Sequence, residues 1–389
     1  MKPCIKIKSI NNFPEKSQFD FSGKSNLEDM KLIFTFILTV LMCSSSFLFA
    51  GNPDRQGEAG AYELLMNPWA RSAGWHTMST SLVSGVNALR INPAGLGNIN
   101  SLEVALGSAR YLIPSGVSFS GLGLAKRLSS HGVMGISLMS VNTGEIRRTT
   151  TESPEGTGAT YKPTLLNIGV SYAHDFITDK DAPENRIRVG VLVRTVTEAI
   201  SDASATGVGL DAGVQYVSGD RGEFKFGVSL RNLGSKMKFS GSGLGLVNAG
   251  EIRKDVQAAS FDMPSLLNIG ASYDFYFADL HRITLLGNFT ANSYSRDEIG
   301  GGLEYSFNDR FMLRGAYKYD NRFGVDAIKG KVNNAYTGLS FGATFQFDVL
   351  KNEDDEGNVT SITKMAVDYA YRTSNPFSGT HNLTLSVKI

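Results

Sequence analysis

The chain has almost no cysteine. Its 389 residues include two, Cys4 and Cys43, and none follows residue 43. If the first 50 residues are removed, the mature protein has no cysteine and needs neither a disulfide nor thiolate chemistry. An exported location is then permitted.

The chain also has no excess of charge and no catalytic motif. Its 38 Lys and Arg residues balance 37 Asp and Glu residues, for a formal net charge of +1. Nucleic-acid binders rely on a concentrated basic surface, so we expect no nucleic-acid partner. The five histidines are scattered, and the one Gly-x-Ser-x-Gly stretch, Gly338–Gly342, lies within a predicted strand and lacks the strand-to-helix turn of a nucleophile motif. We therefore expect no catalytic residues, no cofactor, no metal site and no enzymatic activity.

A long apolar run occurs only near the start of the chain. Leu32–Met42 follows Met30-Lys31 and precedes a small residue, Ala50, that suits a cut. The run is short for a membrane span but has the length of a signal-peptide core. We interpret residues 30–50 as a secretory signal peptide and residues 1–29 as an upstream extension outside the mature protein. An alternative is a lipoprotein attached through Cys43, but the large Met42 stands where such sites have a small residue.

Glycine, in contrast, is abundant, with 42 residues against 11 prolines. The glycines lie within segments in which apolar and polar residues alternate, which indicates closely packed or bent sheet. Two stretches, Pro163–Tyr172 and Pro264–Tyr273, share the pattern Pro-[Thr/Ser]-Leu-Leu-Asn-Ile-Gly-x-Ser-Tyr. A period of two predicts a strand with one apolar and one polar face.

The same alternation recurs through the rest of the chain. We predict fourteen strands: 102–111, 116–127, 132–142, 164–176, 186–197, 207–217, 223–232, 265–277, 282–291, 298–307, 310–319, 337–347, 364–373 and 381–389. The number is even and many segments have about 10 residues, as tilted strands of a membrane barrel require. The predicted fold is all-β, a 14-stranded antiparallel transmembrane β-barrel over residues 101–389.

Charges are confined to the polar face of these strands. A charge facing lipid at mid-bilayer costs about 2–4 kcal/mol, so we expect the polar face to line the lumen. The lumen charges we single out are Arg188, Arg194, Asp211, Arg231, Asp274 and Arg314. A soluble β-sandwich that binds a partner is the alternative. It fits each strand separately, but fourteen strands in one sandwich are uncommon.

The connections alternate in length. Gly144–Lys162, Ser235–Met263 and Asn321–Tyr336 are long, and the connections between them are mostly short. With both termini in the periplasm, every long loop falls on the outer side, as outer-membrane barrels prefer. Val349–Ile362 is the exception, because it is a long connection on the inner side.

Residues 51–100 are not strand-like. Glu58–Met66 predicts a short helix, and Asn92-Pro93-Ala94-Gly95 is a turn signal. From local sequence alone, this segment is equally a plug, or hatch, inside a barrel and an N-terminal cap on a sandwich. With the barrel prediction we take it as the hatch and Asn92, Pro93, Ala94 and Gly95 as its motif.

Several stretches carry a family resemblance. Asn92–Leu96 followed by fourteen strands resembles the FadL-type outer-membrane barrels. Asn67–Gly74, Phe226–Gly234 and Pro264–Tyr273 are similar to the PorV/PorQ family of Bacteroidota. The resemblance implies a barrel with an N-terminal hatch, set in outer-membrane lipid of a Gram-negative bacterium. For PorV itself it implies a partner of the type IX secretion translocon that passes secreted cargo to the surface attachment machinery.

Two functions follow from the resemblance. The first is a PorV/PorQ-type component of type IX protein secretion, which binds the translocon and secreted cargo through its outer loops. The alternative is a FadL-like channel for a hydrophobic ligand. An apolar pocket near Trp69, Trp75 and Leu96 would favour the channel. A lumen packed shut, with an apolar patch on the outer loops, would favour secretion.

Overall fold

The computed structural model describes residues 51–177, 185–246, 254–255, 257–277, 279–320, 337–353, 359–374 and 377–389. The predicted signal peptide and the upstream extension lie outside these residues. Within the described ranges, no helix combines the length and the apolar character that crossing a membrane needs.

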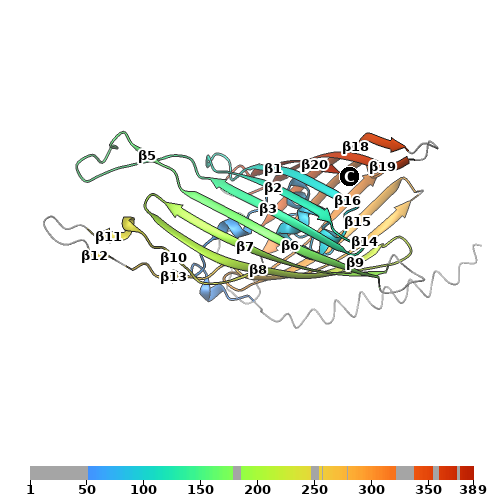
Figure 1. Ribbon diagram of the computed structural model, residues 1–389, viewed down its shortest axis with the longest axis horizontal. Coiled ribbons are helices and arrows are strands. Elements are labelled where there is room, and N and C mark those ends of the chain that lie inside the picture. Colours follow the sequence, from blue (N-terminus) through green and yellow to red (C-terminus); the bar gives the residue numbers. More distant parts are fainter. Residues whose placement is uncertain are drawn as a thin grey trace, which may run out of the picture. The chain divides into compact units, whose positions relative to one another are not determined.

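Fourteen of the described strands form one closed antiparallel barrel in sequence order, and β1 pairs with β20 to close it (Figure 1). They are β1 (Leu102–Arg110), β2 (Ser118–Arg127), β3 (Gly132–Asn142), β6 (Thr164–Ile177), β7 (Arg186–Ile200), β8 (Ala203–Ser218), β9 (Phe224–Gly234), β14 (Leu266–Phe277), β15 (His281–Asn292), β16 (Glu298–Phe307), β17 (Phe311–Asp320), β18 (Gly338–Glu353), β19 (Val359–Arg372) and β20 (Thr380–Lys388). Each of the fourteen predicted segments forms one of them, so the predicted fold class is confirmed.

Side chains alternate across the barrel wall as the two repeats predict. On β6, Ile168 and Val170 are exposed on the outer face, whereas Asn167 is buried on the inner face. On β14, Ile269 and Asn268 take the corresponding positions. The period of two therefore separates an apolar exterior from a polar lumen.

The exterior is that of a membrane barrel. Its middle carries exposed aliphatic side chains, and aromatic rings gather toward both ends, where they suit the membrane–water interface. The exposed rings at one end include Phe176, Phe224, Phe277, Phe307 and Phe311, and those toward the other include Tyr317, Tyr319, Phe341 and Tyr369.

The two ends of the barrel differ. One end, here the turn rim, carries the connections 128–131, 219–223 and 308–310, the start of β1 and the end of β20. The other end, the loop rim, carries the connections 111–117, 143–163, 201–202, 235–265, 293–297 and 373–379. The long connections Gly144–Lys162 and Ser235–Met263 thus share one rim, as predicted. Asn321–Tyr336 lies outside the described residues.

Small two-stranded elements extend from the loop rim (Figure 1). They are β4 (Ile146–Arg147) with β5 (Thr160–Tyr161), β10 (Met237–Lys238) with β13 (Ser260–Phe261), and β11 (Gly245–Leu246) with β12 (Lys254–Asp255), and the 3₁₀ turn η6 (Ser242–Leu244) precedes β11. Isolated bridges join Ser204 to Ser240 and Ala59 to Asp262, so the β10–β13 ribbon is fastened to the barrel and to the N-terminal segment.

The prediction of an unpaired connection at Val349–Ile362 is wrong over its described ends. Leu350 pairs with Thr363 and Lys351 pairs with Ile362, so β18 and β19 continue past the predicted boundaries. Two register shifts, at Asp348/Leu350 and Asn352/Glu353, interrupt the alternation there. An extra residue in one strand moves the side chains that follow it to the opposite face. The period of two is then broken, and the strand cannot be recognised from the sequence there.

Residues 51–100, the hatch, fill the lumen. They form η2 (Pro53–Arg55), η3 (Tyr62–Leu65), α2 (Ala70–Gly74), η4 (Gly85–Arg90) and η5 (Pro93–Gly97). The backbone N–H of Asn52 donates to the carbonyl of Asn292 at the loop rim, 3.2 Å away. That of Ser101 donates to Ile389 at the turn rim, 3.0 Å away. The hatch therefore runs through the barrel from the loop rim to the turn rim.

The hatch packs on the barrel through inward-facing glycines. A Cβ on Gly190 would overlap the backbone at Pro93 and Ala94, and a Cβ on Gly227 would overlap Thr80 and Ser81. Buried hatch side chains, including Trp69 and Leu89, fill the remaining space against β1–β3, β6 and β7. Glycines in the strands are thus needed where the hatch backbone approaches the wall closely.

Candidate functional site

The hatch motif fastens the hatch to the barrel wall. Asn92 caps η5: its Oδ1 accepts a hydrogen bond from the Ala94 N–H at 3.2 Å, and Pro93 takes the first position of the turn. Its Nδ2 donates to the carbonyl of Thr80 at 3.0 Å and to that of Val214, on β8, at 3.1 Å. Gly95 lies beside Val83, with no room for a Cβ.

The six predicted lumen charges all lie buried on the inner face of the wall. Only Arg194 and Asp211 pair with each other. Arg188 pairs with Asp175, Asp274 with Lys225, and Arg314 with Glu304, while Arg231 donates to the Leu64 carbonyl. They are therefore distributed around the lumen and do not form one site.

An apolar cavity opens at the loop rim between the hatch, the barrel strands and the β10–β13 ribbon. This mouth cavity has a volume of about 580 Å³. Its apolar walls come from Met66, Tyr111, Val117, Val141, Leu165, Phe239 and Phe261. The volume lies in the range of small-molecule pockets, and the aromatic and aliphatic lining is typical of them.

Three carboxyl groups, of Glu58, Glu63 and Glu198, interrupt the apolar lining of the mouth cavity. Glu63, on η3, is 2% exposed, and its Oε1 has no hydrogen-bond partner. Glu198, on β7, hydrogen-bonds to Glu63 and accepts from the Ala61 N–H, which Ala61 presents in a left-handed conformation with φ of 51°. Burial and the neighbouring Glu198 carboxylate raise the pKa of Glu63 to about 8.

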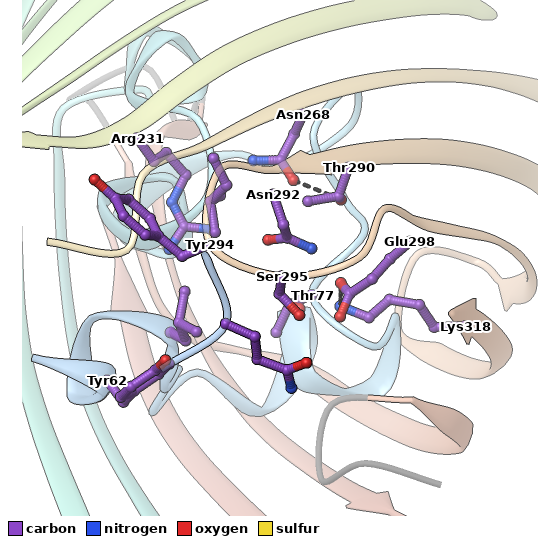
Figure 2. A pocket seen from close by; sticks show the side chains of 13 residues that line it. Tyr62, Thr77, Arg231, Asn268, Thr290, Asn292, Tyr294, Ser295, Glu298 and Lys318 are labelled. Carbon is purple, nitrogen blue, oxygen red and sulfur yellow. Dashed lines mark hydrogen bonds and ion pairs between the residues drawn. The ribbon is translucent and has the colours of Figure 1, made fainter. Parts of the chain in front are cut away.

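A second, more polar cavity lies behind Tyr62, which lines both spaces. This lumen cavity, about 190 Å³, lies between the hatch and strands β14–β17 (Figure 2). Arg231 reaches it from β9, and the ion pair of Lys318 with Glu298 closes one side. On the neighbouring strands of the same wall, the Thr290 hydroxyl donates to Asn268 Oδ1 at 2.8 Å.

The interior around Trp69, Trp75 and Leu96 is packed. All three side chains are fully buried, and neither the mouth cavity nor the lumen cavity is lined by them. In the described part of the chain, no group of three or more His, Cys, Asp or Glu residues is arranged to hold a metal ion.

Sequence reasoning missed the residues that shape the mouth cavity. Glu63 and Glu198 were not among the predicted site residues, and neither was Arg90, which is buried in the hatch and donates to the carbonyls of Glu63 and Met66 at 3.0 and 2.7 Å. One signal was available for Glu198, since it continues the inward-facing positions of β7 one residue beyond the predicted end of the strand at 197. Glu63 carried none.

Comparisons with known proteins give distant likenesses of fold. No family model matches the chain, and neither does any curated protein. Among solved structures, the CymD monoaromatic hydrocarbon channel is 11% identical, with a TM-score of 0.47, over 82% of this chain and 96% of its own. The Pseudomonas putida toluene transporter TodX is 12% identical, with a TM-score of 0.46, over 83% and 97%. A Pseudomonas aeruginosa FadL homologue is 14% identical, with a TM-score of 0.43, over 81% and 96%.

Identities of 11–14% and TM-scores below 0.5 carry no function from these proteins to this chain. None of the comparisons supports the resemblance to the PorV/PorQ family, because neither a family model nor a curated protein of that family matches.

Proposed function

We propose that this protein is a non-enzymatic channel of the Gram-negative outer membrane that admits small hydrophobic or amphiphilic molecules, with its loop rim outside. The observation that carries the proposal is the mouth cavity, an apolar space of about 580 Å³ that opens at the rim with the long loops. The cavity, rather than the distant likeness to hydrocarbon channels, supports this function. A buried apolar wall at an aqueous surface favours capture of an apolar solute from water.

The arrangement behind the mouth cavity suits a gated path. Tyr62 is a shared wall, 40% exposed, between the mouth cavity and the lumen cavity. Rotation of one such ring needs no break in the barrel. Beyond it the hatch occupies the lumen, so passage requires that hatch residues move. We therefore assign the mouth cavity to capture and the hatch to gating.

The absence of cysteine after residue 43 allows a direct test. A Val117→Cys variant places one thiol in the wall of the mouth cavity. After modification with a benzyl methanethiosulfonate reagent, binding of an apolar probe such as naphthalene should fall severalfold, and a reductant should restore it. Equilibrium dialysis of the protein in lipid nanodiscs measures both steps, with empty nanodiscs to subtract partition into lipid.

The matched control is Glu152→Cys, which places the thiol on an exposed residue of the connection between β4 and β5. Its modification should leave naphthalene binding unchanged. Unchanged binding in modified Val117→Cys, or an equal loss in both variants, would contradict capture at the mouth cavity.

A component of type IX protein secretion is the second candidate. One observation favours it: the hatch packs tightly around Trp69, Trp75 and Leu96, as a barrel that works through surface contacts allows. Affinity purification of the tagged protein from solubilised outer membranes tests it. Recovery of a giant translocon barrel together with secreted proteins that share a C-terminal domain would favour secretion over uptake. Recovery of the barrel alone would exclude this candidate.

A further inference from the structure

The mouth cavity presents only one kind of charge to its apolar space. Besides Glu63 and Glu198, its lining includes Glu58, which pairs with Arg55 at 2.7 Å on the exposed side. The Thr143 hydroxyl, also in the lining, is buried without a hydrogen-bond partner. Among the lining residues that the structure describes, lysine and arginine are absent. A ligand therefore meets apolar walls and buried oxygen atoms.

One carboxyl oxygen of Glu63 has no hydrogen-bond donor in the cavity. Glu63 Oε1 is buried without a donor, although Glu198 and its own backbone satisfy other parts of the group. An unsatisfied buried carboxyl oxygen costs free energy that a ligand donor recovers. An ionised carboxylate has no hydrogen to donate. A ligand carboxylate placed beside Glu63 would therefore add charge repulsion.

We propose that the mouth cavity selects cationic amphiphiles, with an ammonium head against Glu63 and Glu198 and an apolar body against Phe239 and Phe261, over carboxylates of equal length. This selectivity rests on the proposed uptake of small molecules and names their chemical class. It predicts a higher affinity for an ammonium compound than for a carboxylate with the same alkyl chain.

The protonation of the pair makes the selectivity depend on pH. Burial and the charge of the Glu198 carboxylate raise the pKa of Glu63 to about 8, so near neutral pH the Glu63 carboxyl mostly keeps its proton. Arg90, from η4, donates to the Glu63 carbonyl at 3.0 Å, and its positive charge opposes the rise in the pKa of Glu63. As the pH rises through 8, Glu63 loses its proton and attraction for a fixed cation increases.

The test uses three ligands of one chain length: octylammonium, whose N–H groups can donate to Glu63, 1-octanol and octanoate. Isothermal titration calorimetry with the full chain in zwitterionic nanodiscs gives their affinities, with empty nanodiscs as the blank. We expect the ammonium compound to bind about tenfold more tightly than octanoate at pH 7. Its affinity should rise further between pH 6 and pH 9, where the ligand itself does not titrate.

Three variants assign the effect to the pair. The Glu198→Gln variant should lose most of the preference at pH 7, and Glu63→Gln should lose the rise with pH. Glu152→Gln, on an exposed connection, is the matched control and should behave as the parent. The gel-mobility shift of the folded barrel on heating shows that each variant is folded.

The outcomes separate this inference from the proposed function. Equal affinities for the three ligands, or a preference that survives in both glutamine variants, would overturn the selectivity and leave capture of apolar solutes standing. Failure of all three ligands to bind would overturn both. Tighter binding of octanoate would overturn the selectivity in the opposite direction.

Discussion

The side-chain amide of Asn92 lies directly against the backbone of Gly213 on β8, where a Cβ would overlap Asn92 Oδ1. The next carbonyl along the strand, that of Val214, accepts a hydrogen bond from Asn92 Nδ2 at 3.1 Å. The two residues are complementary: the absence of a side chain on one lets the other reach bare backbone. This hydrogen bond holds the hatch to the barrel. It requires glycine at position 213, because a side chain there would displace Asn92.

A side chain at position 213 should therefore loosen the hatch. We expect Gly213→Val to lower the free energy of unfolding by about 1–3 kcal/mol, as overpacking of a filled interior does. The tryptophans, Trp69 and Trp75, both lie in the hatch, so their fluorescence during guanidinium unfolding reports on it. Gly287→Val is the control, because a Cβ there meets nothing within 4 Å. Equal losses in the two variants would show that strand substitution, not hatch contact, is responsible.

The buried pair of Arg194 and Asp211 should be costly to break. Both side chains are at most 2% exposed, and Asp211 Oδ1 also accepts the Asn232 N–H at 2.7 Å. Asp211→Asn keeps the shape but leaves the Arg194 guanidinium without its counter-charge. We expect a loss of about 3–5 kcal/mol in the free energy of unfolding.

The control for this pair is Asp279→Asn. Asp279 pairs with Arg221 at 2.8 Å on the exposed turn rim, so its loss should cost under about 1 kcal/mol. Both variants are measured by guanidinium unfolding in lipid vesicles. A cost below about 1 kcal/mol for Asp211→Asn would contradict a paired charge at this site.

The barrel could be predicted from the sequence because each strand carries its own period-two signal, as Thr164–Ile177 does. Where one residue is inserted, as between Asp348 and Leu350, the signal changes face and the predicted strand ends early. The long ends of β7 and β8 were missed because the outer positions there, Thr197, Ser204 and Thr206, are polar and weaken the apolar half of the pattern.

The mouth cavity could not be predicted, because it depends on where the hatch lies. Glu63 lies beside Glu198 on a short turn, η3, that follows Ala61 in a left-handed conformation. No periodic pattern encodes that path. The six lumen charges, in contrast, could be assigned to the inner face from the strand period alone.

The stretches similar to the PorV/PorQ family have structural roles here. Gly227 lies against the backbone of Thr80, and Asn232, with φ of 59°, donates through Nδ2 to the Pro264 carbonyl at 3.0 Å. These contacts pack a hatch and join neighbouring strands. Such residues specify a barrel with a hatch, which is why they indicated the fold and carried no particular function.

A charge on the outer face should test which part of the barrel meets lipid. Leu303 is 47% exposed at the middle of β16 and pairs with Leu285 across the outer face. We expect Leu303→Arg to cost about 2–4 kcal/mol in vesicles. Leu280→Arg, at the turn rim, should cost about 0–1 kcal/mol. Equal costs, measured by guanidinium unfolding, would contradict a bilayer centred on Leu303.

The Glu63 carboxyl should make the stability of the hatch depend on pH. Its folded pKa, about 8, lies above the ordinary value of 4.5, because burial and Glu198 disfavour the ionised form. The folded state therefore binds the proton more tightly than the unfolded state does. This contribution is complete below pH 4.5 and is lost as the pH rises through 8.

In Glu63→Gln this contribution disappears, because the amide does not ionise. We expect the variant to unfold with a free energy that is flatter between pH 5 and pH 9, and to exceed the parent by about 1–3 kcal/mol at pH 9. Fluorescence of Trp69 and Trp75 during guanidinium unfolding at several pH values gives the profile. Glu152→Gln, on an exposed connection, should keep the parental dependence. A parental profile in Glu63→Gln would mean that another group governs this dependence and that Glu63 is not buried as an acid beside Glu198.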